Sequence, residues 1–188
     1  MEHRIFIVLI ISLIFLPVSL SVSAEQEGHS PYSGQERRDI KALSDEEIKG
    51  LRDGSGMGMA KAAELNHYPG PKHVLELASE LELTEKQKDQ TIAAYDIMHE
   101  EALSLGKEII EKETILDRRF AHEHIDEKVL EEITLELGRL MGRLRAAHLK
   151  AHIKMKSILS EDQIKRYDDL RGYGPGSSHR KGHDHSHH

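Results

Sequence analysis

Two histidines and a methionine recur at helical spacing in the last quarter of the chain. His148 and His152 are four residues apart, and Met155 lies three residues further along. Side chains spaced in this way project from one face of a helix, about one turn apart. A single helix can therefore present two imidazoles to one metal ion, and a thioether favours a softer ion such as copper. The alternative is that both histidines are polar residues tolerated in a helical seam.

A preceding helix, folded back against this one, would supply further ligands. If the chain reverses near residue 124, His148 lies level with Glu100. His152 then lies level with Asp96, and His99 is beside them. Imidazoles and carboxylates suit divalent Zn, Ni, Co or Cu. In the competing interpretation, His148 is hydrogen-bonded to Glu100 and His99 faces water. The predicted metal-binding residues are Asp96, His99, Glu100, His148, His152 and Met155.

A second group of histidines ends the chain. The last residues, GPGSSHRKGHDHSHH, contain almost nothing apolar to bury, so we expect residues 172–188 to be a disordered tail. Histidine-rich tracts bind borderline metals with little selectivity. We expect binding in vitro and leave a physiological role open. The tail histidines are His179, His183, His185, His187 and His188.

The composition excludes several classes of protein. The chain of 188 residues has a formal net charge of −7, which argues against nucleic acid as a partner because such binders need a basic face. It has no cysteine, so neither a disulfide nor a thiolate ligand is available. A G-x-S-x-G motif and a phosphate loop after a strand are also lacking. We therefore expect no enzyme activity. The glycine-rich GSGMGMA, residues 54–60, follows a predicted helix, and its Met57 and Met59 fit packing better than copper binding.

The first 24 residues have the layout of a secretory signal peptide. Arg4 precedes an apolar run from Ile5 to about Leu20, and Val22-Ser23-Ala24 places small residues before a cleavage point. An uncleaved membrane anchor is the less favoured alternative. We expect export of the remainder, with a flexible lead-in over residues 25–43 and a helical domain over residues 44–171.

Capping residues divide the helical domain into its elements. Ser44 opens a short helix that Gly54 ends, and Pro71 opens another that extends to about residue 82. A helix from Thr84 to about residue 121 and a second, capped by Asp126 and ending near residue 159, carry apolar residues at steps of three and four. The sequence predicts an all-α fold, a long antiparallel helical hairpin with short flanking helices. Because a lone hairpin exposes much apolar surface, we expect a dimer.

Two similar helix starts bracket this hairpin. They are Leu83-Thr84-Glu85-Lys86-Gln87 and Leu159-Ser160-Glu161-Asp162-Gln163, in which the capping pairs are Thr84 with Gln87 and Ser160 with Gln163. The paired L-T-x-x-Q pattern resembles the Spy/CpxP family of periplasmic proteins, which includes ZraP-like and CnrX-like heavy-metal members, over roughly residues 68–173. The second copy has Ser where the family has Thr. The resemblance implies an all-helical, cradle-like dimer in the periplasm that is a chaperone, a metal buffer or a metal sensor.

Charge keeps the chaperone alternative open. Between Gly138 and Leu159 there are six basic residues and no acidic one, whereas the facing arm is rich in glutamate. Either these cations pair with the facing arm, or they form a basic surface for unfolded clients. That candidate client surface is Arg139, Arg143, Arg145, Lys150 and Lys154. We expect a periplasmic metal-binding protein that acts in heavy-metal or envelope stress. A membrane sensor or an anti-sigma protein would detect its metal-bound state. The alternative is an ATP-independent chaperone of unfolded proteins whose histidines are incidental.

Overall fold

The structure is a computed structural model that describes residues 30–174 of the chain. About 70% of these residues are helical, and none of them lies in a strand. The predicted export segment, residues 25–29 of the lead-in and the five tail histidines lie outside the described residues. Within residues 30–174, no helix is both long enough and apolar enough to cross a membrane.

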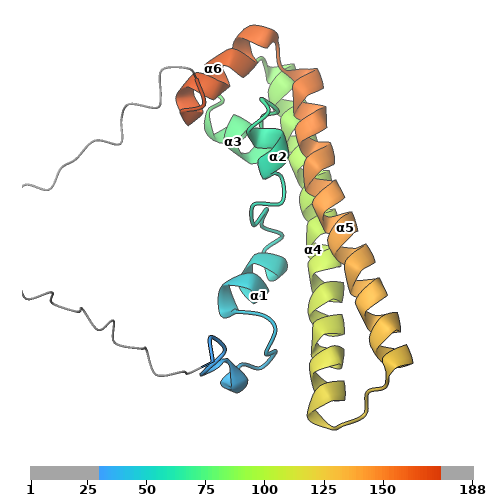
Figure 1. Ribbon diagram of the computed structural model, residues 1–188. Helices are drawn as coiled ribbons and strands as arrows, with labels where there is room; N and C mark the ends of the chain where they lie inside the picture. Colours follow the sequence, from blue (N-terminus) through green and yellow to red (C-terminus); the bar gives the residue numbers. More distant parts are fainter. Residues whose placement is uncertain (1–29, 175–188) are drawn as a thin grey trace, which may run out of the picture. The chain divides into compact units, whose positions relative to one another are not determined.

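Two long helices dominate the structure and confirm the predicted long helical pair. Helix α4 spans Glu85–Ala121, 37 residues, and α5 spans Glu127–Ile158, 32 residues. Figure 1 shows them packed side by side along most of their length. The chain reverses between them in five residues, where Glu123 takes a left-handed backbone conformation with φ 57°. The Asp126 carboxylate then accepts a 2.8 Å bond from the main-chain N–H of Val129 and caps α5.

Five shorter helices accompany the pair. They are η1 (Gln35–Arg37), α1 (Asp45–Arg52), α2 (Lys61–Glu64), α3 (Pro71–Glu76) and α6 (Glu161–Arg171). Helix α1 packs on α4, α2 packs on α5, and α3 touches both long helices. Helix α6 folds back beside the end of the pair where α4 begins and α5 ends (Figure 1). The segment from α1 to α3 thereby covers one side of the helical pair.

Helix α3 is shorter than its sequence predicts. It ends at Glu76, and the chain then turns through residues 77–83 before α4 begins. The turn carries Leu81 into a core beside Val74, and both are at most 2% exposed. The turn therefore keeps Leu81 buried beside Val74 although the helix has ended.

The apolar core consists of two clusters along the pair. The larger lies between α4 and α5 under α1, and the smaller lies where α3, α6 and the ends of the long helices meet. In the larger cluster, α1 approaches α4 closely at Gly106, where a Cβ atom would lie 2.1 Å from the carbonyl oxygen of Leu51. Only a glycine permits this contact between the two backbones.

The two L-T-x-x-Q-like helix starts meet each other in space. Each forms a reciprocal capping box, Thr84 with Gln87 and Ser160 with Gln163. The Gln87 amide also donates to Gln163 Oε1 at 2.8 Å, and the Gln163 amide donates back to Gln87 Oε1 at 3.1 Å. Each amide makes a second donation to a main-chain carbonyl, that of Ile158 or of Leu81. This glutamine clasp ties the start of α4 to the start of α6.

Candidate metal site

The two histidines of α5 lie on the wall of one cavity. His148 is 5% exposed and His152 9% exposed, and both border a cavity of about 390 Å³. The opposite wall comes from the loop after α1 and from the start of α3, residues 53–56 and 70–73. Tyr95 and Met98 of α4 complete the wall. The four-residue spacing therefore places both imidazoles where a single ligand can meet them.

His148 carries a buried polar atom without a partner. Its Nε2 is enclosed and has no hydrogen bond to any described residue. Burial lowers the pKa of this imidazole, and the neighbouring His152 and His99 lower it further. The neutral ring keeps a lone pair on one nitrogen, which is the form that binds a metal ion. A buried nitrogen without a partner is unusual, because such an atom ordinarily costs about 1–3 kcal/mol of stability.

His152 is held in one orientation by its other nitrogen. Its Nδ1 lies 2.8 Å from the main-chain oxygen of Tyr68, which can only accept, so Nδ1 donates and Nε2 carries the lone pair. A Cβ atom on Gly70 would lie 3.2 Å from that Nε2, so glycine leaves the space beside it open. Metal-ligating histidines commonly show this arrangement, in which a carbonyl fixes the tautomer of the ring.

A glutamate that the sequence analysis did not single out stands behind His152. Glu64 Oε2 lies 3.6 Å from His152 Nδ1, and its Oε1 accepts a 2.6 Å bond from the hydroxyl of Tyr167. Burial and this bond raise the pKa of Tyr167 far above its usual range. Tyr173 and Arg171 reach the same carboxylate at 3.3 and 3.5 Å. Helix α6 thus fixes Glu64, and Glu64 adds a negative charge beside His152.

The other predicted ligands are not part of the cavity lining. Asp96 and Glu100 are exposed on α4, and Met155 is fully buried in the smaller core cluster. His99 is half-buried and stacks on Tyr95, with ring centroids 5.4 Å apart. Within residues 30–174, no three or more His, Asp or Glu side chains gather in a metal-binding group. Of the predicted set, the structure places His148 and His152 on the cavity wall and His99 close enough to lower the pKa of His148, and it adds His73 and Asp53 to the wall.

The positions of residues around α4 explain why the carboxylates of Asp96 and Glu100 face away from α5. Met98, Ala102 and Leu105 face α5 in the core, and they are spaced by four and three residues. Asp96 and Glu100 each lie two positions from Met98, which is about 200° around a helix of 3.6 residues per turn. Level positions in a hairpin therefore share a height without facing the same side.

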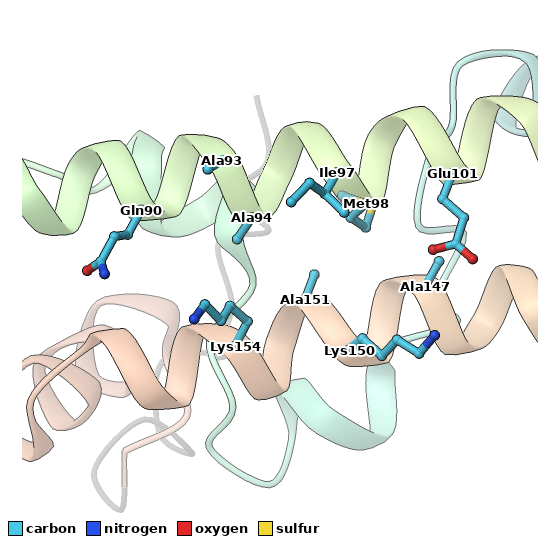
Figure 2. A pocket seen from close by; sticks show the side chains of 10 residues that line it. All are labelled: Gln90, Ala93, Ala94, Ile97, Met98, Glu101, Ala147, Lys150, Ala151 and Lys154. Carbon is cyan, nitrogen blue, oxygen red and sulfur yellow. The ribbon is translucent and has the colours of Figure 1, made fainter.

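A different groove opens between the long helices. It has a volume of about 310 Å³ and a mostly apolar lining, and Figure 2 shows Ile97 and Ala94 of α4 facing Ala151 of α5. Ile97 is 68% exposed. Lys150 and Lys154 line the groove from α5. All six basic residues between Gly138 and Leu159 are exposed, and none lies within 4.0 Å of a carboxylate among residues 30–174.

Comparison of the chain with protein-family models, with curated proteins and with solved structures found no match. What the chain does therefore has to be inferred from the arrangement of its own side chains.

Proposed function

We propose that this chain is an exported divalent-metal-binding protein that buffers or senses metal in heavy-metal or envelope stress. The observation that carries the proposal is the pair of buried imidazoles, His148 and His152, on one cavity wall, together with a His148 Nε2 that has no partner among the described residues. Two imidazoles on one helical face are a chelating pair for Zn, Ni, Co or Cu.

The electrostatics of the cavity favour a cation. The pKa of His148 is lowered, so protons compete less with a metal ion there than at an ordinary imidazole. Glu64 behind His152 places a carboxylate where it offsets the positive charge of a bound ion. Two protein ligands leave coordination positions to water or to His73 and Asp53 of the same wall. Such an open site suits exchange of the ion, which both buffering and sensing need.

The signal-like segment and the resemblance to the Spy/CpxP family support the compartment and the partners of the proposal. A periplasmic location would place the site where metal stress is met first. A second copy of the chain, and a membrane sensor or anti-sigma protein that reads the metal state, are the proposed partners.

The test is a calorimetric titration of full-length protein in which the five tail histidines are changed to serine. We expect one equivalent of Zn²⁺, Ni²⁺, Co²⁺ or Cu²⁺ to bind at about pH 7.5, where imidazoles are neutral. Adding His148→Ala and His152→Ala should weaken binding by at least about tenfold. The matched control changes His122 and His124, which are exposed at the hairpin tip, and it should bind as the parent does. Equal affinity in all three proteins would refute the site.

A second candidate function rests on the groove between α4 and α5. Its apolar lining, with the exposed Ile97 and two lysines, suits an unfolded segment that carries apolar and acidic residues. In that case the protein acts as an ATP-independent chaperone and its histidines are incidental.

Aggregation of a reduced, unfolding client protein tests this candidate. Equimolar wild-type protein should suppress the light scattering of the client, and a variant with Ile97, Lys150 and Lys154 all changed to serine should suppress it less. The matched control changes Leu65 and Lys128 to serine, because both are exposed and lie outside the groove. No suppression by the wild-type protein would remove the chaperone function.

A further inference from the structure

Three methionines line one pocket on the other side of the loop that follows α1. The pocket has a volume of about 440 Å³ and is lined by Met57, Gly58 and Met59 of the loop together with Met141, Gly142 and Arg145 of α5. The loop residues before and after them, Ser55, Gly56 and Ala60, border the histidine cavity instead. The same short loop therefore borders both hollows.

Two of these methionine side chains are more exposed than methionines that pack in an apolar core. Met57 is 41% exposed and Met141 43% exposed. The two other methionines of the described residues, Met98 and Met155, are 8% and 0% exposed and belong to the core. Met59 is intermediate and touches the edge of the larger core cluster. Two of the three methionine side chains are thus partly exposed, and the exposed part of an apolar side chain contributes little to stability.

The backbone holds Met57 in an uncommon conformation. Its φ of 43° lies in the left-handed region, and Gly58 follows with φ 75°. Its side chain lies over Gly50 of α1, where the atom nearest to an added Cβ is the thioether sulfur, followed by Met57 Cγ at 2.9 Å. A non-glycine residue at positive φ costs of order 1 kcal/mol and persists only where the surroundings impose it. The loop therefore holds Met57 against α1, with its thioether sulfur beside Gly50.

We propose that Met57, Met59 and Met141 form a thioether site for a soft monovalent cation, Cu(I) or Ag(I). Thioether sulfur is a soft, neutral ligand that selects Cu(I) and similar ions over Zn²⁺ or Ni²⁺. Arg145, the charged residue of the lining, repels a divalent ion more strongly than a monovalent one. The chain has no cysteine, so methionine is its only source of sulfur ligands.

This site would differ from the histidine pair in its response to pH. Methionine sulfur has no proton to lose, whereas an imidazole must be neutral to bind a metal ion. The two sites would also prefer different ions. One molecule would then hold a soft monovalent ion and a borderline divalent ion on two sides of the loop at residues 53–60.

Methionine oxidation, measured residue by residue, is the first test. Full-length protein is treated with hydrogen peroxide in chloride-free buffer, with and without Ag(I), and sulfoxide formation is followed by peptide mass spectrometry. Without silver, Met57 and Met141 should oxidise much faster than the buried Met98 and Met155, since exposure controls the rate. With silver at ten times its dissociation constant, about a tenth of the sites remain free, so oxidation of the pocket methionines should slow by about tenfold. Silver bound only to histidines leaves these rates unchanged and would overturn the proposal.

X-ray absorption at the copper edge is the second test. Anaerobic Cu(I)-loaded protein should show sulfur neighbours that disappear when all three pocket methionines are changed to leucine, a change that nearly conserves volume. The control Met155→Leu should keep the sulfur neighbours. Only nitrogen neighbours in the wild-type spectrum would refute the thioether site. Neither readout depends on His148 or His152, so failure here leaves the proposed histidine pair untouched.

Discussion

At the scale of single residues, the environment of His148 departs from what an imidazole prefers. Its ring is buried, its Nε2 has no partner among the described residues, and two other imidazoles stand near it. Desolvation disfavours the protonated ring more than any other cause here. The folded protein therefore keeps His148 neutral at a pH where an unfolded chain would protonate it.

The pKa of His148 predicts how stability depends on pH. Below the ordinary imidazole pKa of about 6.5, the unfolded chain binds a proton that the folded chain refuses until the pH reaches the lower folded value. The free energy of unfolding should therefore fall as the pH drops through this window, and His148→Leu should reduce that fall. Urea denaturation at about pH 7.5, 6.5 and 5.5 measures the effect.

The matched control for this prediction is His124→Leu at the exposed hairpin tip. It removes one imidazole without removing a buried one, so it should keep the pH dependence of the wild-type protein. If His148→Leu retained the same pH dependence as wild type and control, the folded protein would not be holding His148 neutral.

At the scale of elements, the contact between α1 and α4 depends on one glycine. Gly106 lies inside α4, where glycine costs about 1 kcal/mol relative to alanine. An alanine there would place its Cβ 2.1 Å from the Leu51 carbonyl oxygen. Backbone cannot move aside as a flexible side chain can, so α1 would have to shift.

Two glycine-to-alanine changes should consequently have opposite signs. Gly138→Ala, inside α5 with no atom within 4 Å of the added Cβ, should raise the free energy of unfolding by up to about 1 kcal/mol. Gly106→Ala should lower it by about 1–3 kcal/mol, because overpacking outweighs the gain in helix propensity. Urea unfolding of both variants measures this. A stabilising Gly106→Ala would show that α1 is not packed tightly on α4.

Most elements could be predicted from the sequence, and the end of α3 is the exception that shows why some could not. Thr84, Asp126 and Ser160 mark helix starts through bonds within three residues, so local sequence is sufficient to find them. The end of α3 at Glu76 is instead followed by a turn that buries Leu81 in a cluster with residues far along the chain. Local capping rules contain no information about such a partner.

At the scale of the whole molecule, both candidate metal sites depend on where the segment from α1 to α3 lies. The spacing of His148 and His152 could be recognised in the sequence, but the opposite wall, residues 53–56 and 70–73, could not. The sequence likewise could not predict that Met141 lies with Met57 and Met59, since more than eighty residues separate them along the chain. Sites formed by a loop against a helix require the tertiary fold itself.

The glutamine clasp gives this molecule a spectroscopic reporter of its own. Both side-chain NH₂ groups of Gln87 and Gln163 use each of their protons in a hydrogen bond, one to the other glutamine and one to a main-chain carbonyl. Their paired amide signals in a nitrogen-correlated NMR spectrum should stand apart from those of solvated glutamines and exchange slowly with water. Any ligand or partner that loosens the junction of α4, α5 and α6 would change the chemical shifts and exchange rates of those four amide protons.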